Sequence, residues 1–348
     1  MINRQNWLDA RAYTHYLQNV CQRDPETVAR TRAHLRHLLE WADDEPLGKA
    51  KTLTPIFPTY LLKARADGRT TQLSVESITK ALSNARGFFT YARMEWPARY
   101  REITDQWLNL LQPPVLARYR SQLVEHKYWD ITDVLKIAAV STETLREERG
   151  KVAIAMLFLT GMRADALASI PISCVDLANG RITQDPRQGV RTKGSKAAIT
   201  YLLQIPELHK IITDWDRRVR SFSPSALWYA TIDREGRQVT ETAQAFEGRH
   251  TLIRNDVKII CERAGVPYLS PHKLRHGHVV YGLQRAKNMR ELKAISQNVM
   301  HSSVTITDQI YGGLLGDDVK DTIASLGQRK SDDLEAKLNE LVELLKAR

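Results

Sequence analysis

Cysteine is scarce in this sequence, and long apolar runs are missing. The three cysteines, Cys21, Cys174 and Cys261, lie far apart, and no C-x-x-C pair occurs. A thiolate metal site or a disulfide framework therefore has no support. The longest apolar run, VAIAMLFLTGM from Val152, has only eleven residues. It is too short to span a bilayer and is typical of a buried helix.

Several signatures of catalysis and targeting are also missing. The sequence contains no G-x-x-x-x-G-K-[ST] loop and no H-E-x-x-H motif, so nucleotide hydrolysis and zinc catalysis lose their usual support. No internal repeat is present. The first residues carry positive charge without a continuous apolar core behind it, so we expect no signal peptide and a cytoplasmic protein. We expect neither a metal nor a cofactor.

Acidic residues are too few to balance the basic ones. Lys and Arg number 51 against 40 Asp and Glu, which gives a net charge of +11. This excess favours a polyanionic partner such as nucleic acid. A membrane-surface protein is the alternative, but no strongly amphipathic basic terminal helix is present. At 348 residues, the chain is long enough for two domains with separate cores.

Two strong helices are predicted in the first hundred residues. Asp24 and Pro25 are typical of a helix start, and a second helix is predicted from Ser74 to just before Pro97. The apolar residues expected to be buried are Val28, Leu35, Leu38, Leu39 and Ala42 in the first helix and Ile78, Leu82, Ala85, Phe88 and Phe89 in the second. The residues left for DNA or for simple solubility are Arg32, Arg36, Lys80, Asn84 and Arg86.

A change of pattern near Pro113 and Pro114 predicts a domain boundary. We expect a helical domain over 1–112, a basic linker over 113–130 with Arg118 and Arg120 as DNA contacts, and a second domain over 131–330. Residues 331–348 predict an amphipathic helix with Leu334, Leu338, Leu341 and Leu345 on one side. That stripe needs a partner surface, which is either its own domain or a neighbouring protomer.

A small β region is predicted in the second domain. GRITQ and GVRT precede KGSK, and AAITYLLQI follows it, which is the pattern of a hairpin with Lys193 at its tip. The fold class is therefore mainly α with a small antiparallel β-sheet. A long amine at a hairpin tip is suited to reach into a groove or to protonate a leaving oxygen.

The stretch SPHKLRHGHVVYGL gathers basic residues at a predicted helix start. Ser270 is expected as the N-cap and Pro271 as the first helical residue. His272, Arg275 and His276 then share one face at the positive end of the helix dipole. This arrangement predicts a bound phosphate. A solvated basic turn with a capping histidine is the alternative.

Two further stretches carry candidate site residues. FLTGMRADAL places Arg163 directly after a buried helix and a Thr-Gly turn, where its planar guanidinium is suited to bind a phosphate. VMHSSVTITDQIYGGL supplies His301 and, ten residues later, Tyr311.

Taken in order, these stretches resemble the tyrosine recombinases of the phage integrase family. The family pattern is an Arg in a T-G-x-R turn, a Lys in a hairpin, an H-x-x-R helix start, a His or Trp, and a Tyr nucleophile. It falls on Arg163, Lys193, His272, Arg275, His301 and Tyr311 across roughly residues 130 to 315. The first half, especially ITKALSNARGFFTYA, resembles the family's helical core-binding domain.

The resemblance implies metal- and ATP-independent strand transfer through a 3′-phosphotyrosyl intermediate. Tyr311 is the nucleophile, and Arg163 and Arg275 clamp the phosphate. The remaining assignments are His272 assisting proton removal from Tyr311, His301 donating to a nonbridging oxygen, and Lys193 protonating the departing 5′ oxygen. His276 is expected to pack beside the site, and His278 is expected to be structural.

The sequence departs from the family pattern in several places. The carboxylate common three residues after the first Arg is replaced by Ala166, while Asp165 stands one place earlier. Met300 stands where a Gly usually precedes the His, and the separation from His301 to Tyr311 is one residue longer than usual. Lys193 is preferred over Lys196 as general acid, with Lys196 assigned to DNA contact.

The function implied is a site-specific DNA recombinase that integrates, excises or resolves a mobile element. Its partners would be a double-stranded recombination site and further copies of itself in a synaptic tetramer, with accessory DNA-bending proteins left open. Its location would be the bacterial cytoplasm, on the nucleoid when bound. A type IB topoisomerase and a DNA-binding protein without catalysis are the alternatives, and the altered spacing before Tyr311 keeps the second one open.

Overall fold

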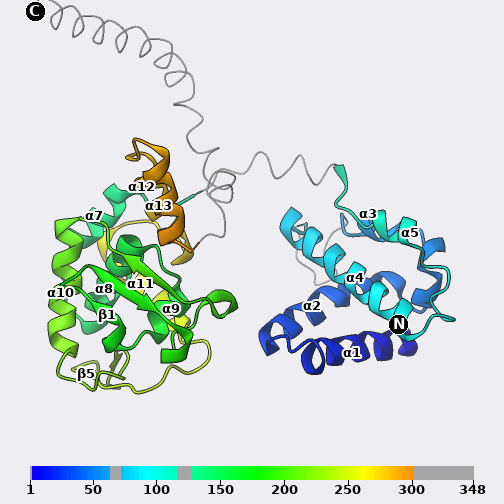
Figure 1. Cartoon of the computed structure of the whole chain (residues 1–348), viewed down its shortest axis with the longest axis horizontal. Helices are drawn as coiled ribbons and strands as arrows, with labels where there is room; N and C mark the ends of the chain where they lie inside the picture. The colour runs from blue at the N-terminus through cyan, green and yellow to red at the C-terminus, as the bar shows by residue number, and fades with distance from the viewer. Residues whose placement is uncertain (1, 63–71, 116–126, 301–348) are drawn as a thin grey trace, which may run out of the picture. The chain divides into compact units, whose positions relative to one another are not determined.

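The chain divides into two compact units, Met1–Glu125 and His126–Arg348, in a computed structural model that describes residues 2–62, 72–115 and 127–300 (Figure 1). Each unit has its own hydrophobic core. The division falls inside the segment 113–130, and the predicted domain bounds themselves stay predictions. Trp129, at the end of that segment, is buried in the core of the second unit.

The first unit is built from helices. Its elements are α1 (Arg4–Asn19), α2 (Pro25–Ala42), the 3-10 segment η1 (Leu47–Thr52), α3 (Phe57–Tyr60), α4 (Val75–Glu95) and α5 (Asp105–Asn109). Helix α2 packs against α1 and α4, and α1 also contacts α4. The buried faces of these three helices supply most of the first core.

The two helix starts predicted in this unit are confirmed. The Asp24 carboxylate accepts a hydrogen bond from the Thr27 amide at 2.8 Å, and Pro25 opens α2. The Ser74 hydroxyl accepts one from the Ser77 amide at 3.2 Å at the start of α4. Every apolar residue expected to be buried in these two helices is buried. The periodicity therefore identified the core-facing side of both helices.

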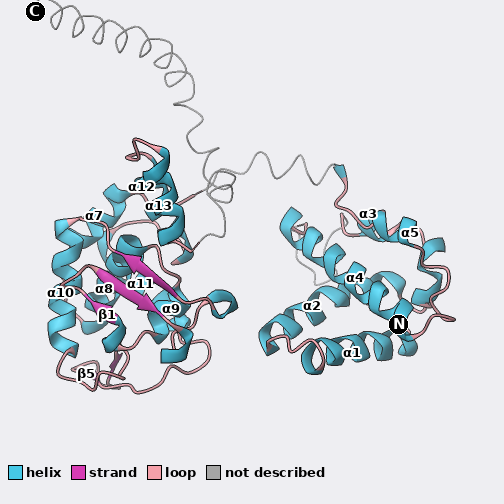
Figure 2. Ribbon diagram, viewed as in Figure 1, coloured by secondary structure: helices cyan, strands magenta, loops and turns pink. Residues whose placement is uncertain are grey.

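The second unit combines helices with short strands (Figure 2). Its helices are α7 (Ile131–Ala139), α8 (Leu145–Thr160), α9 (Ala164–Ser169), α10 (Pro206–Val219), α11 (His250–Ala264), α12 (His272–Leu283) and α13 (Met289–Asn298). Its strands are β1 (Val175–Asp176), β2 (Arg181–Gln184), β3 (Ala198–Tyr201), β4 (Thr231–Ile232) and β5 (Val239–Thr240), with 3-10 turns η2 (Ile172–Cys174), η3 (Pro186–Gln188) and η4 (Lys193–Ser195). The mainly α fold with small antiparallel sheets is confirmed.

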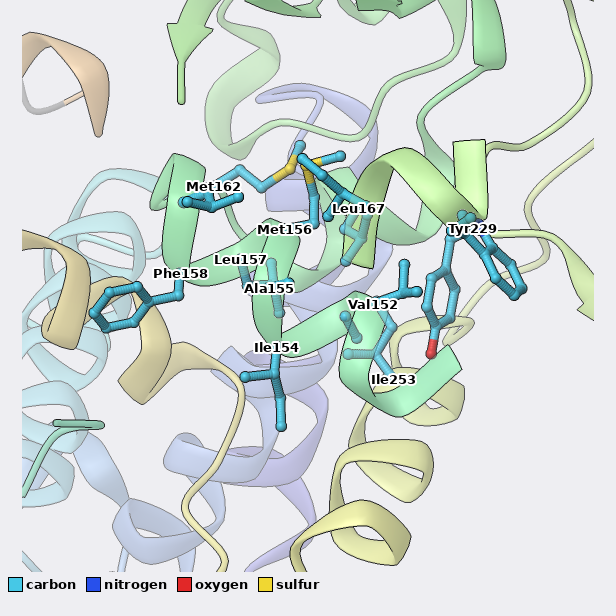
Figure 3. Close-up of a cluster of buried hydrophobic side chains, with 14 of the residues drawn as sticks. Val152, Ile154, Ala155, Met156, Leu157, Phe158, Met162, Leu167, Tyr229 and Ile253 are labelled. Carbon is cyan, nitrogen blue, oxygen red and sulfur yellow. The ribbon is translucent and has the colours of Figure 1, made fainter. Parts of the chain in front are cut away.

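Helix α8 is the centre of this unit. It contacts α7, α9, α10, α11, α12 and β3, and Figure 3 shows its apolar side chains beside Leu167, Tyr229 and Ile253. Thr144 and Glu147 form a capping box at its start. The apolar run from Val152 is buried as predicted. Among the helices of the described ranges, none is long and apolar enough to cross a bilayer.

The prediction of an antiparallel hairpin is confirmed for strands β2 and β3 and is wrong for the segment GVRT. Strands β2 and β3 pair antiparallel, with Arg181 opposite Tyr201 and Gln184 opposite Ala198, and β1 pairs on the other side of β2. GVRT forms no strand. Gly189 turns the chain with a φ of 85°, and the Arg191 amide donates to the Ser169 hydroxyl at 2.8 Å instead of a strand partner.

The predicted start of α12 needs correction. The helix begins at His272, with Pro271 at the cap position and no side-chain capping bond, so the Ser270 hydroxyl does not cap it. The Ser270 carbonyl instead accepts from the Lys273 amide at 2.8 Å. Proline at 271 has a helical φ of −55°, so backbone geometry rather than a side-chain cap sets the start.

A buried polar cluster joins α8 to α11. The Asp256 carboxylate accepts hydrogen bonds from Arg149 Nε at 2.7 Å and from the Tyr229 hydroxyl at 2.6 Å. Arg149 also donates to the Ala230 carbonyl at 3.0 Å. Arg149 and Asp256 are both almost fully buried. Each of the two charges therefore has the opposite charge beside it in a region that water does not reach.

We predict that Asp256→Ala lowers the free energy of unfolding by about 3–5 kcal/mol, because it leaves the Arg149 charge buried without its partner. Urea titration followed by tryptophan fluorescence measures the loss. Asp214→Ala is the control, since Asp214 pairs with Arg217 on the surface and should cost less than about 1 kcal/mol. Equal losses for the two variants would refute the role given to the cluster.

Candidate active site

Arg163 is delivered by a turn that requires glycine. Helix α8 ends at Gly161, which adopts a φ of 64°. A Cβ on Gly161 would lie 2.8 Å from the His278 ring and 2.7 Å from Val299. Arg163 follows at the N-cap of α9 with extended backbone. The packing of α8, α12 and α13 therefore fixes the position of the backbone at Arg163.

The Arg163 guanidinium is half-buried, and burial lowers its pKa. Its side chain makes no hydrogen bond or ion pair with any residue in the described ranges. Asp165, the nearby carboxylate, pairs with His250 Nδ1 at 2.8 Å. Because Ala166 stands where the family pattern has a carboxylate, Arg163 has no carboxylate partner in the described ranges. Its partly desolvated cation is suited to bind an anion.

Arg275 is buried and holds two chain segments together. Its guanidinium donates to the Gly161 carbonyl at 2.8 Å and to the Val299 carbonyl. The side chain is almost fully inaccessible. The first contact fixes the turn before Arg163, and the second fixes the backbone at the end of α13.

His272 lies where several positive charges meet. Its ring packs edge-on against His276, with centroids 4.9 Å apart, and the residue is exposed. Desolvation lowers the pKa of His272 most, and the positive charges of Arg275, Arg163, Lys273 and Lys193 lower it further. The lowered pKa favours the neutral imidazole, which is the form that can accept a proton.

Lys193 lies in the connection between β2 and β3. The turn is closed by a hydrogen bond from the Thr192 hydroxyl to the Lys196 carbonyl at 2.7 Å, and Gly194 has a φ of 69°. Lys193 and Lys196 are both exposed. Of the two, only the Lys193 charge acts on the pKa of His272, which favours Lys193 as the lysine that faces the site.

The end of α13 is tied down by residues that the sequence did not single out. The Asn298 side chain accepts from the Tyr201 amide at 2.7 Å and donates to the Tyr201 carbonyl at 3.0 Å, so it pairs with β3 as a neighbouring strand would. It also donates to the Thr160 carbonyl at 3.3 Å. An asparagine near a helix end carries no sequence signal for such a role.

His278 is structural, as expected. Its Nδ1 donates to the Phe158 carbonyl at 2.7 Å. Burial lowers its pKa to about 4, so the ring is neutral. The other ring nitrogen then accepts from Asn298 at 3.4 Å. His278 thus joins α12 to α8 and α13.

The predicted DNA-binding residues of the first unit fall into two groups. Arg36 pairs with Glu40 and Lys80 with Glu76 on their own helices, and Asn84 donates to the Lys80 carbonyl. The side chains of Arg32 and Arg86 make no hydrogen bond or ion pair in the described part of the chain, and both are exposed. Burial lowers the pKa of His34 on α2 most, and the charges of His37 and of Lys80 on α4 lower it further, in line with the packing of α2 against α4.

The other candidates lie outside the described residues: His301, Tyr311, Arg118, Arg120 and the leucine stripe of 331–348. The candidates that the structure does describe in the second unit are Arg163, Lys193, His272 and Arg275, and the contacts and charges above relate them to one another. In the same ranges, no group of three or more His, Cys, Asp and Glu side chains is placed to hold a metal ion.

Comparisons with known proteins identify the family of this chain. Residues 128–314 match the model of the phage integrase family, which is more than half of the chain. The tyrosine recombinase XerD of Neisseria meningitidis serogroup A is 25% identical over 315 residues, covering 88% of this chain and 89% of that protein.

Solved structures extend the likeness to the fold. A lambda integrase (75–356) dimer bound to a COC' core site gives a TM-score of 0.58 at 16% identity, covering 89% of this chain and 95% of that chain. A lambda integrase tetramer bound to a Holliday junction gives 0.57 at 16% identity, covering 88% and 76%. These matches define a class of DNA strand-transferring enzymes. The chain belongs to the phage integrase family, that of the tyrosine recombinases.

Met300 occupies a backbone conformation that favours glycine, with a φ of 56°. We predict that Met300→Gly leaves stability unchanged or raises it by up to about 1 kcal/mol, because it removes this strain. Met300→Val should be destabilising, since a β-branched residue fits this region poorly. Urea unfolding of the two variants beside wild type gives both values. A stable valine variant together with an unstable glycine variant would contradict the assignment.

Proposed function

We propose that this chain is a site-specific DNA recombinase that cleaves and rejoins strands through a 3′-phosphotyrosyl intermediate at Tyr311. One observation carries the proposal: Arg275, on the same helix as His272, donates to the carbonyl of Gly161 in the turn that presents Arg163. In line with this arrangement, burial lowers the pKa of His272 most, and the charges of Arg275, Arg163, Lys273 and Lys193 lower it further. Several cations gathered near one imidazole match the needs of a phosphodiester under attack, where negative charge grows on the nonbridging oxygens.

The proposed reaction uses only protein groups. The Tyr311 oxygen attacks the phosphorus while His272 accepts the phenol proton, and the bond from phosphorus to the 5′ oxygen breaks. Lys193 gives a proton to that oxygen, which leaves as a 5′ hydroxyl. Arg163, Arg275 and His301 stabilise the transition state. Attack by another 5′ hydroxyl on the phosphotyrosine reverses the steps and reseals the strand without ATP.

The partner in this proposal is duplex DNA. Arg32 on α2 and Arg86 on α4 are exposed basic side chains on two helices that pack together, and they support DNA binding by the first unit. Lys196, Arg118 and Arg120 are proposed as further phosphate contacts. Assembly into a synaptic tetramer in the cytoplasm is proposed because the similar lambda integrase has been solved as a tetramer on a Holliday junction. The biological task proposed is integration, excision or resolution of a mobile element.

We predict that Tyr311→Phe binds DNA normally and forms no covalent adduct with a nicked recombination-site duplex, because only the nucleophilic oxygen is removed. Denaturing gels of labelled DNA reveal the adduct. Arg163→Ala is the companion variant and should slow adduct formation by on the order of 100-fold. An adduct formed by Tyr311→Phe would rule out Tyr311 as nucleophile. A separate assay for recombination between paired sites distinguishes a recombinase from a topoisomerase.

We predict that Arg32→Gln and Arg86→Gln each reduce the slope of log affinity against log salt by about one, as expected for one lost phosphate contact. Arg30→Gln is the matched control. Arg30 lies two residues from Arg32, on the opposite side of α2, and pairs with Glu26. Fluorescence anisotropy over a salt series measures each slope. Equal slopes for all four proteins would remove this face from the DNA.

A further inference from the structure

Arg191 lies two residues before Lys193, in the segment between β2 and β3. Arg191 is exposed, and an exposed arginine is suited to contact a phosphate. The structure uses it differently. Its guanidinium donates to the Ala245 carbonyl at 2.6 Å and to the Phe246 carbonyl at 2.9 Å. Both terminal nitrogens are thus engaged with the segment that leads into α11.

The backbone of Arg191 is anchored as well as its side chain. Its amide donates to the Ser169 hydroxyl at 2.8 Å. That hydroxyl donates in turn to the Asp165 carbonyl at 2.8 Å. Ser169 is the last residue of α9, and Arg163 caps the start of the same helix. Arg191 therefore links the Lys193 turn to the helix that presents Arg163.

These contacts close a ring. The segment held by the Arg191 guanidinium continues to His250 at the start of α11, and His250 Nδ1 pairs with the Asp165 carboxylate at 2.8 Å. Asp165 lies two residues after Arg163. The ring thus runs from α9 through Arg191 and residues 245–250 back to α9. Directly after Arg191 in the chain, the Thr192 hydroxyl closes the turn that carries Lys193.

We propose that Arg191 is a positioning residue for the general acid, Lys193, and not a DNA contact. This inference rests on the proposed function, in which Lys193 protonates the 5′ oxygen. A lysine side chain is flexible and its ammonium has no fixed direction, so the backbone beneath it must be held for proton transfer to be efficient. The two carbonyls held by Arg191 supply that restraint, and they set the distance between the Lys193 turn and Arg163.

The test is cleavage of two substrates by the full-length chain. One is a nicked duplex with an ordinary phosphodiester, and the other carries sulfur in place of the bridging 5′ oxygen. A thiolate leaves without a proton, so the second substrate does not need the general acid. Arg191→Ala should cleave the ordinary substrate roughly 10- to 100-fold more slowly, since a displacement of about 1 Å has this scale of effect. It should cleave the sulfur substrate at close to the wild-type rate.

Three variants separate the possible outcomes. Lys193→Ala must show the same rescue by sulfur; if it does not, the role of Lys193 in the proposed function fails, and this inference fails with it. If Lys193→Ala is rescued and Arg191→Ala is slow on both substrates, the inference alone is overturned. Arg187→Ala is the matched control, because Arg187 lies in the same connection, is exposed, and pairs with Asp185 among the residues that the structure describes. It should behave as wild type on both substrates.

Two further measurements complete the test. Arg191→Lys keeps the charge but loses the fork that holds two carbonyls, so it should also be slow on the ordinary substrate and rescued by sulfur. A fully active Arg191→Lys would overturn the positioning role. The salt dependence of DNA binding by Arg191→Ala should equal that of wild type. A slope lower by about one would make Arg191 a phosphate contact and would also overturn the proposal.

Discussion

The site in the second unit depends on one buried guanidinium. Arg275 is enclosed, and its charge is matched by the carbonyls of Gly161 and Val299. A buried cation that loses such partners costs several kcal/mol, so the fold is stable only while these two carbonyls stay beside α12. The turn before Arg163 and the end of α13 are then held to the same point. One buried residue therefore holds together the segments that carry the candidate site.

Much of the fold could be predicted because its determinants are local. The starts of α2 and α4 follow from Asp24 and Ser74, and their buried faces follow from helical periodicity. The buried character of α8 follows from its apolar run. The four described catalytic candidates could be assigned from the order of short motifs, and the charges acting on His272 fit that assignment. The order of the motifs does not give the distances between these side chains in the folded chain.

The features that the sequence did not predict depend on distant partners. GVRT has β propensity, yet the Arg191 amide is taken by Ser169, which is 22 residues away. The Ser270 hydroxyl was expected to cap α12, but Pro271 already fixes the backbone there. Asn298 pairs with β3 from 97 residues away. Side chains whose partners lie so far along the chain leave no periodic or motif signal, and only the folded backbone reveals them.

The placement of charge has a practical consequence for handling the protein. The pair of Arg149 and Asp256 lies inside the second core, where dissolved ions do not screen it. The basic residues on the surface of α2 and α4 are fully open to screening. Concentrated salt should therefore strip bound nucleic acid from the chain during purification while leaving the folded units intact. Returning to low ionic strength would then restore attraction to DNA without any refolding step.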